Sequence, residues 1–260
     1  MQRSVLYNLG FATAVCIVCA VVVSGAAVVL QSRQQANAAL DKQKNVLVAA
    51  GLAKDGEDLS RDEISARFEP IEPVLIDLET GEEVEGGDPA SFDQRKATSA
   101  AATSDPAPPN AALVQRVPHR ALIYRMRKEA GGVDLYILPV EGKGLWSTLY
   151  GFVALDADLT TVRGITFYEH KETPGLGGEV DNPRWKALWP GRKLFDESGE
   201  PAISVVKGRA GPAQEDPHHV DGLSGATMTS RGVTNLLHFW LGESGFGPFL
   251  ERVRANRKEA

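Results

Sequence analysis

The chain has 260 residues, 43% of them hydrophobic and 24% charged, and a net charge of −6 at pH 7. This balance is typical of a globular protein, and the length allows one large or two small domains. The charge is uneven: of the 28 Lys and Arg residues only Arg3 lies in residues 1–30, which leaves 27 basic and 34 acidic residues beyond them. So acidic a remainder excludes nucleic acid and anionic lipid as its main partner.

An uncharged stretch over residues 5–30 predicts a transmembrane helix. It has 26 residues, and about 20 residues of helix cross the hydrocarbon core of a bilayer. A cleaved signal peptide is the alternative, but its apolar region usually has about 7–15 residues. The small residues Ala36 and Ala38 that resemble a cleavage site lie beyond the charged Arg33. We therefore expect an uncleaved anchor in the lipid bilayer over residues 1–33.

The charges that flank this stretch leave its orientation open. Arg3 and the amino terminus lie before it, and Arg33, Lys42 and Lys44 lie after it. The positive-inside rule compares such counts, and here they do not differ enough to decide.

Both cysteines, Cys16 and Cys19, lie in the apolar stretch. A C-x-x-C spacing occurs in redox proteins and iron–sulfur proteins, and it places both side chains on one helix face. A cluster usually takes four thiolates, however, and cysteine also behaves as a small apolar residue. We expect no cofactor on these two side chains alone.

Residues 34–81 are predicted to connect the anchor to the main domain. They contain apolar residues at helical spacing, then a capping-box pattern from Ser60 to Glu63, and then a short run of strand-forming residues. The expected elements are a helix over residues 34–54 that stops near Gly51, a short helix that Pro70 ends, and a strand over residues 74–78.

Residues 82–120 are predicted to be a polar insertion or linker. From Glu82 to Asn110 the chain is mostly Gly, Ser, Ala, Pro and charged residues. Such a segment has too little apolar surface to offset the entropy lost on ordering.

The core domain is predicted over residues 121–260, with strands in its middle and helices at its end. Apolar residues from Val233 to Leu241 recur at helical spacing and predict a buried helix face, and a second helix is expected over residues 246–257. A block of strands with helices around it indicates an α+β fold with a central, mainly antiparallel sheet. The strands are expected over residues 121–125, 133–138, 149–155, 162–168 and 203–206.

The most informative segment is Asp221-Gly-Leu-Ser-Gly-Ala-Thr227, directly before the amphipathic helix. Small side chains let a bulky group approach the backbone, and Thr229 or Ser230 fits an N-cap. The free N–H groups and the dipole of a helix start favour a phosphate, for which Thr227 offers a hydroxyl. Without further information, a simple capping loop explains the same residues.

The pattern from Asp221 to Thr227 resembles the motif at which a periplasmic flavin transferase esterifies the final threonine with flavin mononucleotide (FMN). Two further segments, residues 142–152 and 169–185, together with the apolar start, resemble the C subunit of the bacterial sodium-translocating NADH:quinone oxidoreductase. The resemblance covers nearly the whole chain except residues 99–110. It implies covalent FMN on Thr227 and no complete activity of the chain alone.

The residues themselves are compatible with a flavin site without requiring one. The glycine-rich loop from Glu172 to Gly178 could lie against a flat ring or be an ordinary turn. Trp146 could cover the ring or belong to the core, and Lys207 could pair with the phosphate or simply be exposed. The site implied by the resemblance comprises Asp221, Ser224, Gly225, Ala226, Thr227, Thr229, Gly144, Leu145, Trp146, Glu172, Thr173, Pro174, Gly175, Leu176, Gly177 and Lys207.

Other chemistry finds little support. His170 with its neighbouring glutamates, and the pair His218 and His219, lack the spacing and ligand number of a metal site. No catalytic triad or cysteine nucleophile stands out, and no G-x-G-x-x-G fingerprint opens a helix, so NADH is expected on another subunit.

The resemblance implies an electron-transfer subunit in the bacterial inner membrane, with Met1 cytoplasmic and the domain periplasmic. Its partners would be the other membrane and cytoplasmic subunits and, transiently, the flavin transferase. The homologous subunit of a ferredoxin:NAD oxidoreductase complex is the nearest alternative, and an anchored binding domain without redox chemistry is another. The span has no carboxylate, so we do not expect the sodium path there.

Overall fold

The computed structural model describes residues 5–128 and 131–259, and it forms two compact units that meet between Gln43 and Lys44. Met1, expected on the cytoplasmic side, and Arg3, whose charge leaves the orientation open, lie outside the described residues. Helix α1 (Val5–Ala49) provides all described residues of the first unit, and its last residues from Lys44 on belong to the second. The positive φ of Gly51, 73°, ends it near the expected place.

The second unit is built on a five-stranded sheet in the order β1-β4-β5-β6-β7, in which every neighbouring pair is antiparallel. This confirms the α+β fold and its antiparallel sheet. Strand β1 comes from the segment predicted to connect anchor and domain, so the sheet begins earlier in the chain than residue 121. The strands are β1 (Ile71–Asp77), β4 (Arg120–Arg127), β5 (Val133–Lys143), β6 (Thr148–Asp156) and β7 (Val162–Glu169).

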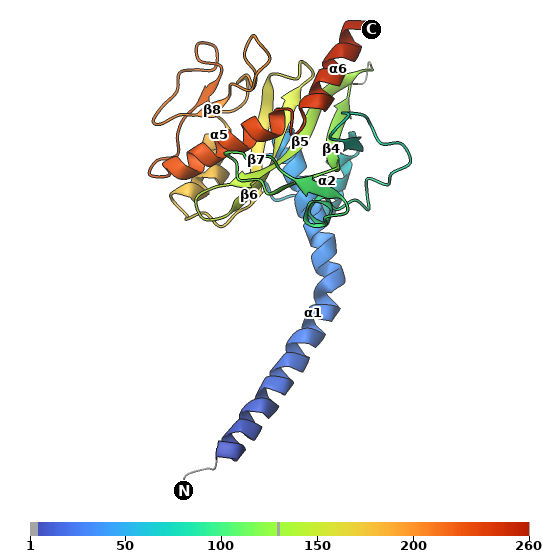
Figure 1. Ribbon diagram of the computed structural model, residues 1–260, viewed down its shortest axis with the longest axis vertical. Helices are drawn as coiled ribbons and strands as arrows, with labels where there is room; N and C mark the ends of the chain where they lie inside the picture. Colours follow the sequence, from blue (N-terminus) through green and yellow to red (C-terminus); the bar gives the residue numbers. More distant parts are fainter. Residues whose placement is uncertain (1–4, 129–130, 260) are drawn as a thin grey trace. The chain divides into compact units, whose positions relative to one another are not determined.

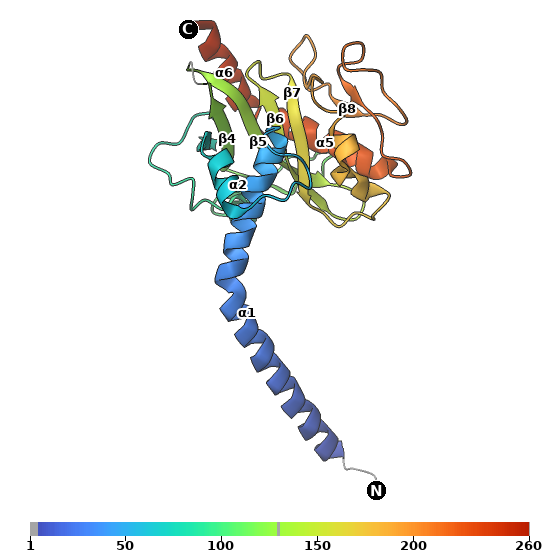
Figure 2. The same cartoon turned by 180° about the vertical axis from the view of Figure 1, so that it is seen from behind.

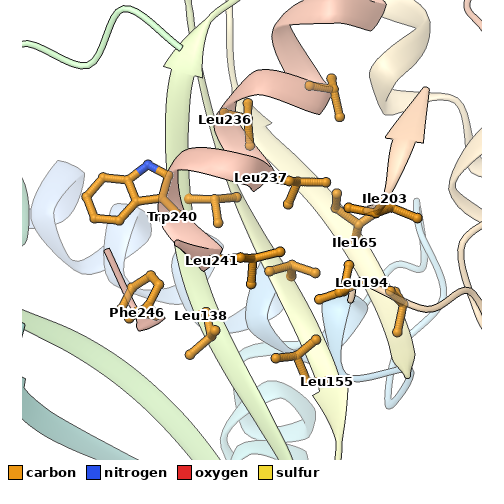
Figure 3. Packing of buried hydrophobic residues seen from close by; sticks show 14 of the residues in the cluster. Leu138, Leu155, Ile165, Leu194, Ile203, Leu236, Leu237, Trp240, Leu241 and Phe246 are labelled. Atoms are coloured by element: carbon orange, nitrogen blue, oxygen red, sulfur yellow. The ribbon is translucent and has the colours of Figure 1, made fainter. Parts of the chain in front are cut away.

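Helix α5 (Thr227–Leu241) crosses one face of the sheet (Figure 1). A Cβ on Gly142 of β5 would lie 2.5 Å from the Cβ of Leu236, so the helix and the strand pack in close contact. The apolar stripe predicted from Val233 to Leu241 is buried here. It faces Leu138, Leu155 and Ile165 across the core shown in Figure 3. Helix α6 (Gly247–Glu259) follows.

The opposite face of the sheet is covered by helix α2 (Arg61–Phe68) and by the end of α1, as the view from behind shows (Figure 2). The capping box predicted at Ser60 and Glu63 is present. A Cβ on Gly164 of β7 would lie 2.5 Å from the backbone oxygen of Ala49, so α1 ends in close contact with this face.

The predicted insertion over residues 82–120 contains a helix, α3 (Gln94–Ser99), and a two-stranded sheet of β2 (Ser104–Pro106) and β3 (Arg116–Pro118). The expectation of a segment too polar to order was therefore wrong for this part. Hydrogen bonds of side chains to the backbone replace a large apolar core: the hydroxyl of the fully buried Ser104, for example, donates to the carbonyl oxygens of Thr98 and Ala100.

The segment between β7 and α5 is mostly loop. The strand predicted over residues 203–206 is shorter and does not join the central sheet. It pairs in parallel with the segment just before the motif. The elements here are the 3₁₀ turn η1 (Gly177–Asp181), helix α4 (Pro183–Lys186), β8 (Ser204–Val205) and β9 (His219–Val220).

Candidate functional site

The motif loop ends at the first residue of α5. Thr227 opens the helix and is exposed, and Ala226 occupies the N-cap position, where no side chain accepts a hydrogen bond from the helix. The prediction that Thr229 or Ser230 caps the helix was wrong, because both lie inside its first turn and are buried. The simple capping explanation of these hydroxyls therefore fails.

The backbone N–H groups at the start of α5 are available to a ligand. Ser230 N–H donates to the carbonyl of Ala226. Within the part of the chain that the structure describes, the N–H groups of Thr227, Met228 and Thr229 have no acceptor. Three such groups at the positive end of a 15-residue helix form an arrangement that favours a phosphate.

Glu172 is the centre of the site and is only 5% exposed. Its carboxylate accepts the N–H groups of Leu145, Trp146 and Ser147 at 3.2, 2.9 and 3.0 Å, and the hydroxyl of Thr229 at 2.7 Å. Burial raises the pKa of Glu172, but these hydrogen bonds outweigh burial and hold the pKa below its ordinary value. One carboxylate thus joins the β5–β6 turn, its own loop and the start of α5.

Two glycines of the site make room for this carboxylate. A Cβ on Gly144 would lie 2.7 Å from Glu172 Oε1. A Cβ on Gly177 would lie 2.6 Å from Thr229 Oγ1 and 2.7 Å from Glu172 Oε2. All three distances are too short for a real Cβ atom, so glycine at these positions is a packing requirement.

Four large apolar side chains are exposed on the elements that Glu172 joins, namely the β5–β6 turn, its own loop and the start of α5. Trp146 is 67% exposed, which rules out the alternative that it belongs to the core. Leu176 lies against the motif loop, because a Cβ on Gly225 would come within 2.8 Å of its Cδ2 atom. The group, which we call the apolar face, consists of Leu145, Trp146, Leu176 and Met228. Such a face on a soluble domain indicates a site for a ligand or a partner.

A cavity of about 780 Å³ is lined by Thr227, by the motif loop and by the β8 segment. Its wall includes Lys207, which is exposed, together with Arg209 and Arg231. The prediction noted Lys207 but missed both arginines. Arg231 could have been found from the sequence, because it lies four residues after Thr227 and so on the same helix face.

The remaining predicted residues shape the two loops. The carboxylate of Asp221 accepts the N–H of Ala210, and its carbonyl accepts the indole N–H of Trp185. Ser224 is exposed at the surface of the motif loop, and Gly175 has a φ of 76° that favours glycine. Thr173 and Pro174 are exposed, and the Thr173 carbonyl accepts the N–H groups of residues 176 and 178.

The histidines considered for a metal site have other partners. His170 Nε2 lies 2.7 Å from an oxygen of Asp181, His218 Nδ1 lies 2.9 Å from the Lys193 carbonyl, and His219 pairs with Asp216. Across residues 5–128 and 131–259, no group of three or more His, Cys, Asp or Glu side chains is placed to hold a metal ion.

The Glu172→Gln variant is expected to be less stable than the parent by about 1–3 kcal/mol at neutral pH, because it loses charge-assisted hydrogen bonds. Because its pKa is lowered, ionised Glu172 stabilises the fold at pH values above 4.5, the ordinary pKa of a glutamate. This contribution disappears as the pH falls through the pKa of Glu172 in the folded state. Thermal melts from about pH 7 to about pH 3 should therefore show the two proteins converging. A constant difference over this range would show that the charge of Glu172 is not what stabilises the site.

Comparison with known proteins places this chain in a family. Residues 144–242 match the model of an FMN-binding domain. The chain is 51% identical over 242 residues to the C subunit of the Na(+)-translocating NADH-quinone reductase of Yersinia pestis, covering 92% of this chain and 89% of the relative. The corresponding Pseudomonas aeruginosa protein is 48% identical over 257 residues and 97% of each chain. The crystal structure of Shewanella oneidensis NqrC superposes with a TM-score of 0.76 at 36% identity, covering 83% of this chain and 97% of that one.

Proposed function

The chain belongs to the NqrC family, the C subunits of the Na⁺-translocating NADH-quinone reductases, and on this premise we propose that it transfers electrons through an FMN joined to Thr227 by a phosphoester. Thr227 carries this proposal: it is an exposed threonine on the first residue of an uncapped helix, and it lines a cavity whose wall also carries Lys207 and Arg231. Bound FMN would supply one-electron redox chemistry, and the protein positions it.

The phosphate would lie at the start of α5. The unpaired N–H groups of Thr227, Met228 and Thr229 and the helix dipole favour its negative charge. Arg231 and Lys207 in the cavity wall add positive charge on the same side.

The isoalloxazine ring would lie on the apolar face. Trp146 and Leu176 offer exposed apolar surface on two loops that Glu172 and its hydrogen bonds hold in place. Rigid support of this kind is what a redox site requires, because the cofactor must keep its position as its charge changes.

Family membership decides between the two complexes that the sequence left open, in favour of the NADH-quinone reductase. We propose as partners the other membrane and cytoplasmic subunits and, during maturation, a periplasmic flavin transferase. The colour of the purified protein distinguishes the proposed flavoprotein from an anchored domain without redox chemistry. The chain purified after co-expression with the transferase should be yellow, and a colourless protein would contradict the proposal.

The apolar part of α1 would anchor the chain in the membrane. Residues Val5–Gln31 lie in one helix, and their most apolar stretch of 18 residues has a mean hydropathy of 2.7 and is not buried in the structure. A helix of 27 residues is long enough to cross a bilayer. Attachment of flavin outside the cytoplasm requires the domain to be periplasmic.

Reporter fusions test this orientation. A reporter that is active only in the periplasm, fused at any exposed loop after Gln43, should be active, and one that is active only in the cytoplasm should be silent. The mature protein should also keep its apolar helix. The reverse reporter pattern, or a mature amino terminus near Ala39, would contradict the proposed topology.

A further inference from the structure

The ammonium group of Lys186 lies inside the second unit, with the side chain only 9% exposed. Its Nζ atom lies 2.6 Å from Asp55 Oδ2 and 3.8 Å from Asp181 Oδ1, and it donates to the hydroxyl of the fully buried Thr166 at 3.2 Å. Burying a charge is costly, and apolar residues of equal volume often stabilise a fold as well as a buried ion pair does. The buried ion pair is therefore weak evidence that this lysine serves stability alone.

Through Asp181, Lys186 contacts the segment from His170 to Asp181, at which the flavin is proposed to lie. Asp181 ends η1, and its Oδ2 atom lies 2.7 Å from His170 Nε2. The other ring nitrogen of His170 accepts the N–H of Glu172 at 3.2 Å. These contacts hold together the two ends of the segment from His170 to Asp181, which carries Leu176 of the apolar face.

The Asp55 contact reaches the segment that follows α1. The N–H groups of Leu52 and Ala53 donate to the carbonyl of Leu47, which is fully buried. Asp55 therefore follows a segment fixed on the face of the sheet opposite α5. Lys186 joins this fixed segment to the loop from His170 to Asp181, although Asp55 and Lys186 are 131 residues apart in the sequence.

We propose that Lys186 is a positioning residue for the flavin site. Its contacts with Asp55 and Asp181 set the orientation of the loop from His170 to Asp181, and with it the side of Leu176 that faces the flavin. This inference rests on the proposed function, because it takes the flavin to lie at this loop.

The first test uses the full chain with Thr227→Ala, which carries no flavin, and adds Lys186→Met. Amide hydrogen exchange at Leu176, Gly178 and Glu179, whose N–H groups bond within the loop, should become about tenfold faster or more, while exchange in β5 and β6 stays as it was. Asp55→Asn should act in the same direction. Lys193→Met removes a more exposed ion pair with Asp158 and should leave the loop unchanged. Unchanged loop exchange, or an equal rise in β5 and β6, would overturn the proposal.

The second test uses the flavin-loaded chain with Thr227 intact. Flavin fluorescence anisotropy should decay faster in Lys186→Met than in the parent, and Lys186→Arg should restore the slower decay by restoring the charge. Equal decay in all three proteins would overturn the positioning role even if loop exchange had changed. A parent without flavin would contradict the proposed function, and the first test, which needs no flavin, tells that failure apart from a failure of Lys186 to hold the loop.

Discussion

The Thr227→Ala variant is expected to lose all covalently bound flavin. Thr227 is exposed at the first position of α5, where the transferase can reach its hydroxyl and the free N–H groups can stabilise the phosphate. Thr229, the obvious competitor two residues later, is fully buried, and its hydroxyl donates to Glu172. Flavin fluorescence of the protein band on a denaturing gel measures the result.

Two variants serve as controls for this substitution. Thr229→Val removes the competing hydroxyl but keeps the shape of the side chain, and Ser224→Ala removes an exposed hydroxyl of the motif loop. Both should still give a fluorescent band. A fluorescent Thr227→Ala band would exclude Thr227 as the attachment point.

The Leu237→Ala variant is expected to lower the free energy of unfolding by about 2–5 kcal/mol, because it leaves a cavity under α5. Leu237 is fully buried and points into the cluster that contains Leu138 and Ile165 (Figure 3). A whole domain is stable by only about 5–15 kcal/mol, so the helix that presents Thr227 should loosen. Flavin loading should fall although no motif residue has changed. Denaturant unfolding and flavin occupancy, measured at equal expression, test both effects.

The matched control must be an exposed leucine away from the motif. Leu223, in the motif loop itself, is unsuitable because it is only 6% exposed and belongs to the same core. Leu113 is 60% exposed, and Leu113→Ala should change stability by less than about 0.5 kcal/mol. If Leu237→Ala is as stable as Leu113→Ala, burial of α5 does not position the attachment threonine.

Periodic patterns were the most reliable guide to the fold. The stripe from Val233 to Leu241 predicted α5 and its buried face, and the capping box at Ser60 predicted the start of α2, because both depend on neighbours within a few residues. The start of α5 was misplaced for the opposite reason. Thr229 looks like a cap locally, but its hydroxyl is bound by Glu172, which is 57 residues away in the sequence.

Long-range contacts also explain what the sequence did not reveal about the site. Nothing near Glu172 in the sequence indicates that its carboxylate holds the turn at Trp146. The exposure of Trp146 could not be inferred either, since an aromatic residue between two strands is usually buried. The order in the insertion depends on Ser104, whose hydrogen-bond partners the composition does not specify.

The most direct test of flavin attachment at Thr227 is the mass of one peptide. Trypsin cleaves after Arg209 and Arg231, which releases Thr227 together with Ser224, Thr229 and Ser230 on a single peptide. We predict that this peptide from the mature protein is heavier by one FMN less one water, and that fragmentation places the added mass on Thr227. An unmodified peptide, or the added mass on any of the other three residues, would contradict the proposed attachment.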